Sequence, residues 1–371
     1  MTETTTAAAP PQEARRAPAS LADRAIKRRR VLDILDAAGR DSLLLTSHTA
    51  LTWYLDGSRV HISLAGDPIA AMLVDRGGDH LVTFNNEAGR IAAEELPAQV
   101  YLQTVPWHGN LHQAAAAVGS NTRPPLAEAD VATELRAARQ QLLPAESARY
   151  SLLSAELAAI MTDVLSAARP DTTEFGLVSA LAARVVAAGA EPLVLLCNGS
   201  SRSAFRHPLA THSPLGRRAM AVVCARRDGL VANITRWVRF DAGTPEERDA
   251  EARIAAVEAD IFDATVPGAR LDRIFAEIQA AYVRHGFGAD QWEQHHQGGP
   301  AGYAGRDPRV TQAATDVVVL DQAFTWNPSG PGVKIEDTVQ LTDSGLRILT
   351  VDPRWPVTTV NGLHRPETLQ L

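Results

Sequence analysis

The chain has 371 residues, more than one ordinary hydrophobic core needs, and 45% of them are hydrophobic, so two well-buried domains are expected. The 36 basic and 43 acidic side chains give a formal net charge of −7 without a long basic run, which argues against a nucleic-acid partner. No stretch has the ~20 consecutive apolar residues of a membrane span. Cys197 and Cys224 form no spacing motif and are expected to be reduced thiols of a cytoplasmic protein.

The first third of the chain predicts a small α/β domain behind a disordered tail. Residues 1–20 are rich in Thr, Ala and Pro and lack an apolar segment, which is not typical of a signal peptide or an anchor. Ser20 is a plausible N-cap of a helix that ends near Gly39. Strands are predicted at residues 42–46, 71–75, 80–84 and 100–105, with a hairpin around Arg-Gly-Gly-Asp and a helix at about 87–95.

The rest of the chain predicts a larger domain of mixed composition. A boundary is expected at Pro144, which follows a charged, alanine-rich segment and begins a long helix to about residue 168. A second helix is expected after Glu174. Further strands are predicted at 192–196, 222–225 and 230–240, then helices at 245–264 and 271–285, and last strands that carry Asn327 and Glu336.

Three short segments of this larger domain resemble the metal-binding core of the creatinase, aminopeptidase P and methionine aminopeptidase superfamily. They are Asn233-Ile-Thr-Arg236, Thr325-Trp-Asn-Pro328 and Lys334-Ile-Glu-Asp-Thr338. The resemblance implies an α+β protein in which a pita-bread catalytic domain, residues 144–360, follows a smaller creatinase-type α/β domain, residues 21–143. In dimers of that superfamily the smaller domain can reach the partner's active site.

Most metal ligands of that superfamily are missing from this chain. The resemblance places Val222 and Asn233 at two aspartate positions, Gly299 at a histidine position and Asn327 at a glutamate position, and it leaves Glu336 as the last carboxylate. A dinuclear site needs several anionic oxygens to offset ion dehydration, which these neutral residues cannot supply. We therefore predict a member that binds neither metal nor another cofactor.

Two residues are expected to carry catalysis. His207 occupies the place of the histidine that serves creatinase as general base and acid, and an imidazole with a pKa near ~6.5 suits that exchange. Glu336 matches the glutamate that binds the guanidino group of creatine, which a carboxylate can do through paired N–H···O bonds. Each also has a structural interpretation: His207 as a packed loop residue, and Glu336 as a buried acid held by strand amides or by Arg236.

Further residues are expected to bind the substrate. Creatinase holds a substrate carboxylate with one arginine from each domain, and Arg306, seven residues after the missing histidine ligand, and Arg59 are the candidates for this role, although either could instead pair with a surface carboxylate. Arg59 and His61 are expected where a strand begins, facing the cleft of a second subunit. The other expected contacts are His295, His296, Asn233 and Asn327.

The histidine pair also leaves a metal role open. Adjacent residues on a loop or strand point apart, and no Asp or Cys partner is suitably spaced, so His295 and His296 are expected to contact the substrate, or to supply a second proton carrier, rather than to bind a metal.

These residues favour a metal-independent, creatinase-like hydrolase that cleaves a C–N bond in a small carboxylate-bearing amide or amidine. One alternative is a non-catalytic binding module. The other is a Xaa-Pro aminopeptidase-like metallopeptidase with an atypical site, in which Glu336, Asn233 and the histidine pair hold one metal. The expected partners are a small-molecule substrate and a second copy of the chain, without nucleic acid or membrane.

Overall fold

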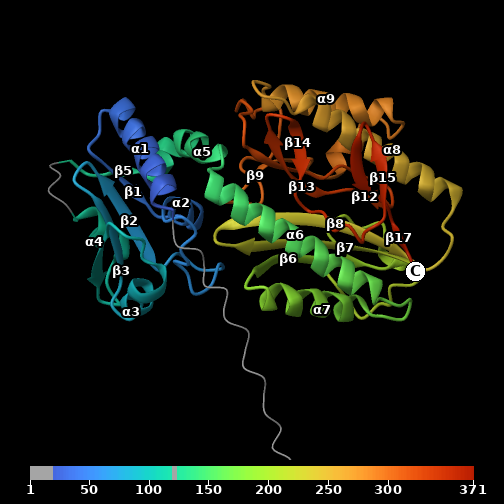
Figure 1. Ribbon diagram of the computed structural model, residues 1–371, viewed down its shortest axis with the longest axis horizontal. Helices are drawn as coiled ribbons and strands as arrows, with labels where there is room; N and C mark the ends of the chain where they lie inside the picture. Colours follow the sequence, from blue (N-terminus) through green and yellow to red (C-terminus); the bar gives the residue numbers. More distant parts are fainter. Residues whose placement is uncertain (1–19, 119–122) are drawn as a thin grey trace, which may run out of the picture.

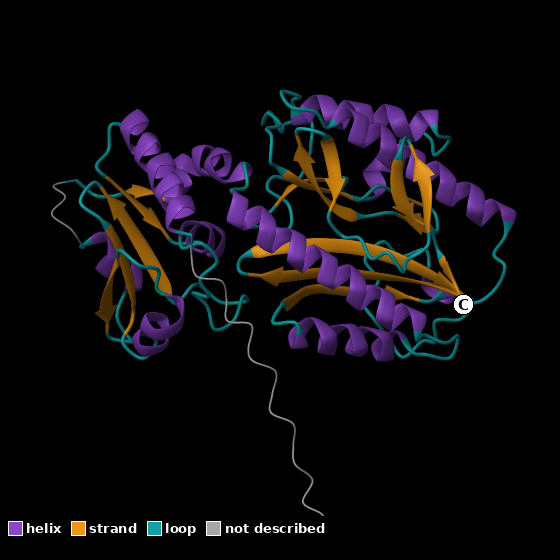
Figure 2. Ribbon diagram, viewed as in Figure 1, coloured by secondary structure: helices purple, strands orange, loops and turns teal. Residues whose placement is uncertain are grey.

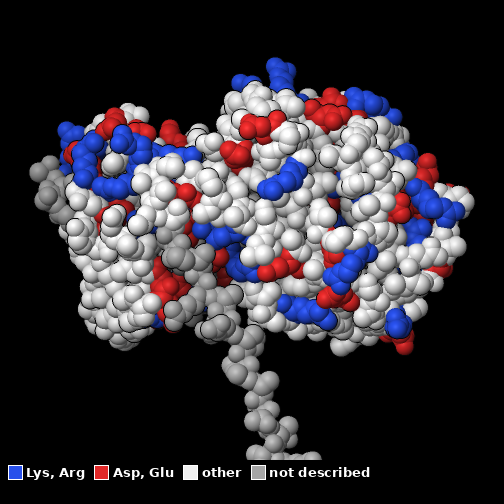
Figure 3. Space-filling model, in the orientation of Figure 1, with Lys and Arg blue, Asp and Glu red and all other residues white. Residues whose placement is uncertain are grey.

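Two layered units lie side by side along the long axis of the molecule (Figure 1). The structure is a computed structural model, and it describes residues 20–118 and 123–371. The tail predicted for residues 1–20 therefore lies outside the described residues, apart from Ser20. On the face drawn in Figure 3, basic and acidic side chains are interspersed over both units. None of the described helices is long and apolar enough to cross a membrane.

The smaller unit is built on a five-stranded sheet with the order β4-β3-β2-β1-β5. β2 and β3 form the predicted antiparallel hairpin, whereas β3 and β4 run parallel. The first helix has the predicted ends, because the Ser20 side chain accepts a hydrogen bond from Asp23 N and Gly39 ends the helix at φ 60°. The strands are β1 Ser42–Leu45, β2 Ala70–Asp75, β3 Asp79–Phe84, β4 Val100–Val105 and β5 Leu126–Ala127; the helices are α1 Leu21–Ala38, α2 His48–Tyr54, α3 Ala88–Arg90 with a π-helical turn at Ile91–Glu95, α4 Leu111–Ala116 and α5 Ala132–Gln140, preceded by a short turn at Glu128–Val131.

The strand predicted to begin at Arg59 and His61 is absent from the structure, and this prediction is wrong. α2 ends at Tyr54, and Asp56 and Gly57 turn the chain at φ 58° and 99°. Beyond this turn the Arg59 backbone N–H donates to the Glu95 side chain at 2.8 Å instead of to a neighbouring strand. A side chain thus takes the place of a ladder partner, and the segment is a loop.

The larger unit begins with a four-stranded sheet of order β17-β8-β7-β6, covered on one face by two helices (Figure 2). Small apolar side chains on that face, such as Ala221, Val223 and Ile234, pack in one core with the helices. The alternating side chains, such as Val222 and Asn233, point to the opposite face because the strand period is two. The elements are α6 Pro144–Ser166, α7 Glu174–Ala187, β6 Glu191–Asn198, a short turn at Ser200–Arg202, β7 Arg218–Arg227, β8 Leu230–Arg239 and β17 Leu369–Gln370.

A second sheet, of order β14-β13-β10-β9, lies over the opposite face and is itself covered by α8 and α9 (Figure 1). Phe324, Trp326 and Val339 of this sheet pack with Ile261 and Ile278 of the two helices in a second core. The elements are α8 Pro245–Ala264, α9 Leu271–Arg284, a short turn at Gln291–Gln294, β9 Gly298–Ala301, β10 Ala323–Trp326, β11 Ser329–Gly330, β12 Val333–Lys334, β13 Asp337–Thr342, β14 Gly345–Ile348, β15 Val357–Val360 and β16 Leu363–Pro366.

A buried ion cluster joins the two units. Lys27 of α1 is fully buried, with its ammonium 2.8 Å from Asp56 and 2.7 Å from Glu146 of α6. Arg149 adds a second cation at 2.8 Å from Asp56, and the Tyr303 hydroxyl donates to Glu146 at 2.7 Å. Two cations therefore face two carboxylates, and the cluster fixes α1 of the smaller unit against α6 of the larger one.

Candidate active site

The structure brings the five ligand positions of the sequence motifs together between the two sheets. On the β7–β8 hairpin Val222 lies opposite Thr235, and Thr235 forms a bridge with Glu336. Thr325 of β10 connects Gly299 and Asn233. Its backbone pairs with Gly299 of β9, and its hydroxyl accepts a hydrogen bond from the Asn233 side-chain amide at 3.3 Å. Asn327 follows two residues after Thr325. Three segments of the chain, namely the β7–β8 hairpin, β9 and the segment from Asn327 to Glu336, thus frame one site.

Glu336 is a buried carboxylate held by two cations of the chain. Its Oε2 accepts from Lys334 Nζ at 2.6 Å and from the Thr235 hydroxyl at 2.7 Å, and its Oε1 accepts from Arg306 at 2.8 Å. Burial opposes ionisation, but Lys334 and Arg306 outweigh it and hold the pKa of Glu336 well below its usual range. The expected alternative partner, Arg236, instead pairs with Asp337 at 2.8 Å.

Three histidines gather beside this carboxylate. His207 Nε2 and His295 Nε2 are 3.1 Å apart, and the rings of His295 and His296 stack with centroids 4.4 Å apart. The expectation that the adjacent side chains point apart is therefore wrong. The chain bends at His295, directly after the short turn at Gln291–Gln294, and residues 295–297 do not form a regular strand.

The histidine cluster is uncharged at neutral pH. Burial and then the Lys334 ammonium lower the pKa of His295 to about 2, while burial and then Arg306 lower the pKa of His296 to about 4. Burial, followed by Lys334, also lowers the pKa of His207 below its ordinary value. Neutral imidazoles can accept a proton, and His207 is the one of the three that is exposed to solvent.

The residues present do not fit the dinuclear metal centre that the motifs imply. A side chain at Gly299 would place its Cβ 2.6 Å from Pro308 O and 3.0 Å from Val310 N, and φ there is 140°, so the backbone leaves no room for a histidine. Val222 and the two asparagines carry no charge, and both oxygens of Glu336 already have cationic partners. Such a site lacks the anionic oxygens that divalent ions require.

The histidine cluster offers a different donor set. The candidate ligand atoms of His207, His295 and His296 lie within 4.8 Å of one another, and three imidazoles are a common donor set for zinc. The surrounding charge opposes a dication, because Lys334 acts on all three rings, with Arg306 or Arg309 acting on His296 and His207. Among the described residues, Glu336 is the one carboxylate that acts on the three rings against these cations.

Arg59 and His61 do not join this cluster within the chain. The Arg59 side chain, 59% exposed, contacts Glu95 at 2.5 Å, and His61 contacts Glu191 of β6 at 2.5 Å. Arg226 shares Glu191 at 2.8 Å, so these contacts lie where the smaller unit meets the hairpin end of the sheet. Their approach to a partner subunit stays a prediction.

Sequence reasoning missed Lys334, although a signal was available. Lys334 stands two residues before Glu336, and a strand period of two places both side chains on one face. Lys334 lines a small pocket together with Asn198, Phe205, Arg206, Trp237 and His295.

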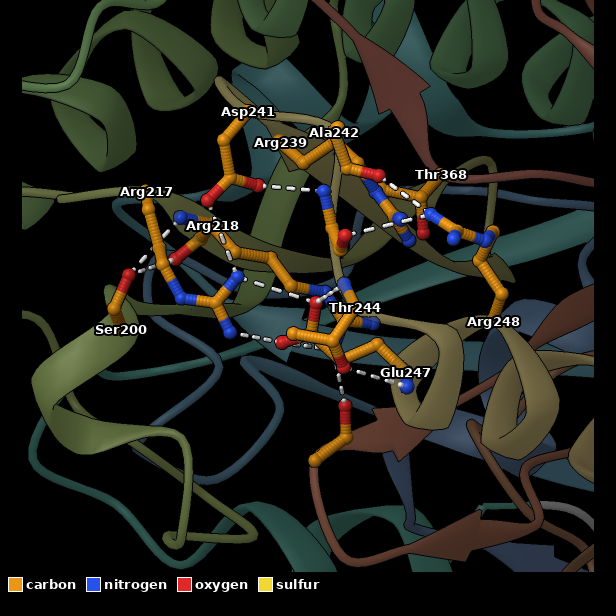
Figure 4. Close-up of polar contacts among 12 residues, drawn as sticks. Ser200, Arg217, Arg218, Arg239, Asp241, Ala242, Thr244, Glu247, Arg248 and Thr368 are labelled. Carbon is orange, nitrogen blue, oxygen red and sulfur yellow. Dashed lines mark hydrogen bonds and ion pairs between the residues drawn. The ribbon is translucent and has the colours of Figure 1, made fainter.

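Several arginines, Arg218 among them, form a network of polar contacts (Figure 4), and Arg218 connects this network to two residues that line the pocket. Arg218 stacks on the Trp237 ring at 4.1 Å and donates to Gly332 O at 2.9 Å, in the turn that leads to Lys334. Trp237 Nε1 in turn donates to Lys334 O at 2.9 Å. Arg218 and Thr368 both contact Glu251, so the C-terminal segment is tied into the same network. The backbone of Lys334 is therefore fixed from two sides.

Comparison with known proteins identifies the fold. The model of metallopeptidase family M24 matches residues 148–343. The dipeptidase PepE from Mycobacterium ulcerans has a TM-score of 0.75 at 17% identity, covering 96% of this chain and 100% of that one. The prolidase from Pyrococcus horikoshii OT3 has a TM-score of 0.74 at 16% sequence identity, and the match covers 88% of this chain and 99% of that one. The N-terminal domain of FACT complex subunit SPT16 from chickpea, Cicer arietinum, has a TM-score of 0.65 at 12% sequence identity, and the match covers 88% of this chain and 95% of that one. No curated protein matches the chain. The expected pita-bread fold behind a smaller N-terminal domain is confirmed.

Proposed function

We propose that the chain works without metal. It belongs to metallopeptidase family M24, so it is a peptidase-like hydrolase by family, but it keeps only one of the five metal ligands that the motifs predict. The proposed reaction is creatinase-like: hydrolysis of a C–N bond in a small amide or amidine that carries a carboxylate. The observation that carries the proposal is the environment of Glu336, whose oxygens face Lys334 and Arg306 where a family member would present them to metal ions.

His207 is the proposed proton carrier. Its neutral ring takes a proton from water as the water oxygen bonds to the substrate carbon, and it gives that proton to the nitrogen as the C–N bond breaks. The contact of 3.1 Å with His295 holds the His207 ring in place, since His295 stays neutral and offers either a donor or an acceptor.

Several buried polar atoms of the site lack partners within the described residues, and a ligand would satisfy them. They include Arg306 Nε, the Nδ1 atoms of His295 and His296, and Asn327 Oδ1. Leaving such atoms unpaired costs roughly 1–3 kcal/mol each in an ordinary core, so their concentration here supports a binding site. In the proposal Arg306 binds the substrate carboxylate, while Glu336 and the two asparagines bind its N–H groups.

The decisive experiment joins metal analysis to turnover. Protein purified without chelator is assayed by elemental analysis and against small amides and amidines with a carboxylate, with Xaa-Pro dipeptides as the comparison class. We expect turnover of the first class, unchanged after dialysis against EDTA. Stoichiometric Mn, Co, Zn or Fe that leaves together with the activity would overturn the proposal and favour an atypical metallopeptidase, the class that the name of the matching family states.

A second candidate is a non-catalytic binding module. The name of the SPT16 neighbour places this fold in a subunit of a complex, and the neutral residues at four ligand positions would suit such a use. Turnover of no compound in either class, by protein that is folded and metal-free, would favour this candidate.

The proposal includes a cytoplasmic homodimer in which Arg59 and His61 reach the partner's site. It is supported by the Arg59 side chain, which stays 59% exposed despite its contact with Glu95. A monomeric mass in solution with full activity would remove this part and leave the proposed chemistry intact.

A further inference from the structure

The chain uses lysine at two positions, Lys27 and Lys334, among its 36 basic residues. Both are buried ammonium groups in ion pairs. Lys27 faces two carboxylates, Asp56 and Glu146, at 2.8 and 2.7 Å. Lys334 faces one, Glu336, and shares it with Arg306. The positive charge at Lys27 is therefore balanced locally, whereas the charge at Lys334 is not.

The surroundings supply no second anion among the described residues. The adjacent Asp337 is committed to Arg236 and Arg365, at 2.8 and 2.9 Å. The next carboxylate along the loop after β9, Asp307, pairs with Arg139. The three histidines are neutral, so the group of Lys334, Arg306 and Glu336 carries a net charge of +1 in a buried place. A buried cation without a counter-charge is unfavourable, and an anionic ligand would offset it.

Lys334 also has donors to spare. An ammonium carries three N–H groups, and within the described residues one of them has a hydrogen-bond partner, Glu336 Oε2. Its side chain is 7% exposed, and Lys334 is one of the residues that line the pocket with His295. Because Trp237 and Arg218 fix the backbone on either side, the ammonium is held in place before a ligand arrives.

We infer that Lys334 is the electrophilic group of this site, whose ammonium binds an anionic oxygen of the substrate and so supplies charge that metal ions would otherwise provide. The inference rests on the proposed hydrolase function. The oxygen has two possible sources: a carboxylate that the substrate already carries, or the oxyanion that forms when water adds to an amide carbonyl.

In the second case Lys334 keeps its proton throughout. Water oxygen bonds to the carbon, its proton goes to His207, and the carbonyl electron pair moves onto the oxygen beside the ammonium. The pair then re-forms the C=O bond, the C–N bond breaks, and the nitrogen takes the proton from His207.

Two lysines in the whole chain make this testable without a known substrate. Protein labelled with ¹³C at lysine Cε and ¹⁵N at Nζ gives two lysine side-chain signals, assigned with Lys27→Arg and Lys334→Arg. We expect sodium acetate, and separately inorganic phosphate, to shift the Lys334 signal saturably while the Lys27 signal stays in place as an internal control. Parallel shifts of both signals, or none at Lys334, would overturn the inference whether or not the protein proves to be a hydrolase.

Turnover separates the two sources of the anion once a substrate is found. Loss of an oxyanion contact in Lys334→Met should lower kcat by ~10²–10³ with little change in KM, whereas loss of a carboxylate contact should mainly raise KM. Lys27→Arg is the matched control and should change neither. If Lys334→Met does not fold, Lys334→Arg keeps the charge and displaces it, and it should show the same split in weaker form. Unchanged kcat and KM in a folded Lys334 variant would overturn the inference.

Discussion

His207→Gln removes the proposed proton carrier while keeping a polar side chain of similar size. His207 contacts His295 through Nε2, and that imidazole is the exposed member of the cluster, so the change should leave the buried packing in place. A general base or acid contributes ~10²–10⁴ in rate, which corresponds to about 2.7–5.5 kcal/mol in activation free energy. We expect kcat to fall by that factor and KM to change little.

The assay is the dependence of kcat/KM on pH for the wild type, His207→Gln and His212→Gln. His212 is the matched control because it is an exposed histidine of the same loop whose ring contacts Phe175 instead of the cluster. Burial lowers the pKa of His207, so its basic form prevails at pH 7 and activity should fall on the acid side, below ~6.5. That limb should be absent from His207→Gln and retained in His212→Gln. Near-normal turnover of His207→Gln would refute the mechanism.

Three further substitutions test the charged and titratable groups of the ion cluster and of the site. Lys27→Met leaves two buried carboxylates with one cation and should lower the free energy of unfolding by ~3–5 kcal/mol, measured by urea denaturation. The pKa of His295 is lower in the folded protein than in the unfolded chain, so below pH ~6.5 the unfolded chain binds one more proton. As the pH falls from 6.5 to 4, the free energy of unfolding should therefore decrease by up to ~1.4 kcal/mol per pH unit, and less steeply in His295→Gln. Glu336→Gln should weaken both substrate affinity and rate, measured as kcat and KM.

Each of these has an outcome that would contradict it. A Lys27→Met protein as stable as the wild type would mean that the ion cluster does not hold the two units together. An unchanged pH slope in His295→Gln would place the titrating group elsewhere. Wild-type kinetics in Glu336→Gln would remove that carboxylate from the reaction.

Local signals in the sequence were enough to predict most elements. Ser20 and Gly39 mark the ends of α1 because a cap side chain and a left-handed residue are local requirements. Pro144 marks the start of α6 for the same kind of reason. The strand predicted at Arg59 failed because the backbone partner there is the side chain of Glu95, 36 residues away, which no local pattern reveals.

The motifs predicted the positions of the site but not its contacts. Sequence spacing matched Glu336 and Arg306 separately to the superfamily, while the ion pair between them depends on how two loops approach. The convergence of His295 and His296 on His207 likewise depends on a bend in the chain rather than on residue type. The two-residue period of a strand predicts that Lys334 and Glu336 lie on one face, but the excess positive charge of the site is seen only when the three-dimensional contacts of Lys334, Arg306 and Glu336 are known.

The substitutions in this site form one coherent electrostatic change. A family centre that holds two divalent ions balances them with carboxylates, so losing the ions while keeping the carboxylates would leave uncompensated negative charge. Here the carboxylate positions are neutral apart from Glu336, and Lys334 and Arg306 make the remaining group positive. In the proposal of a metal-independent hydrolase, the site thus keeps the sign of charge that polarises a substrate oxygen, but carries it on side chains. The ammonium is a compact unit charge with three rotatable donors and the guanidinium is a rigid planar fork, and each of them can bind an anionic oxygen of a substrate.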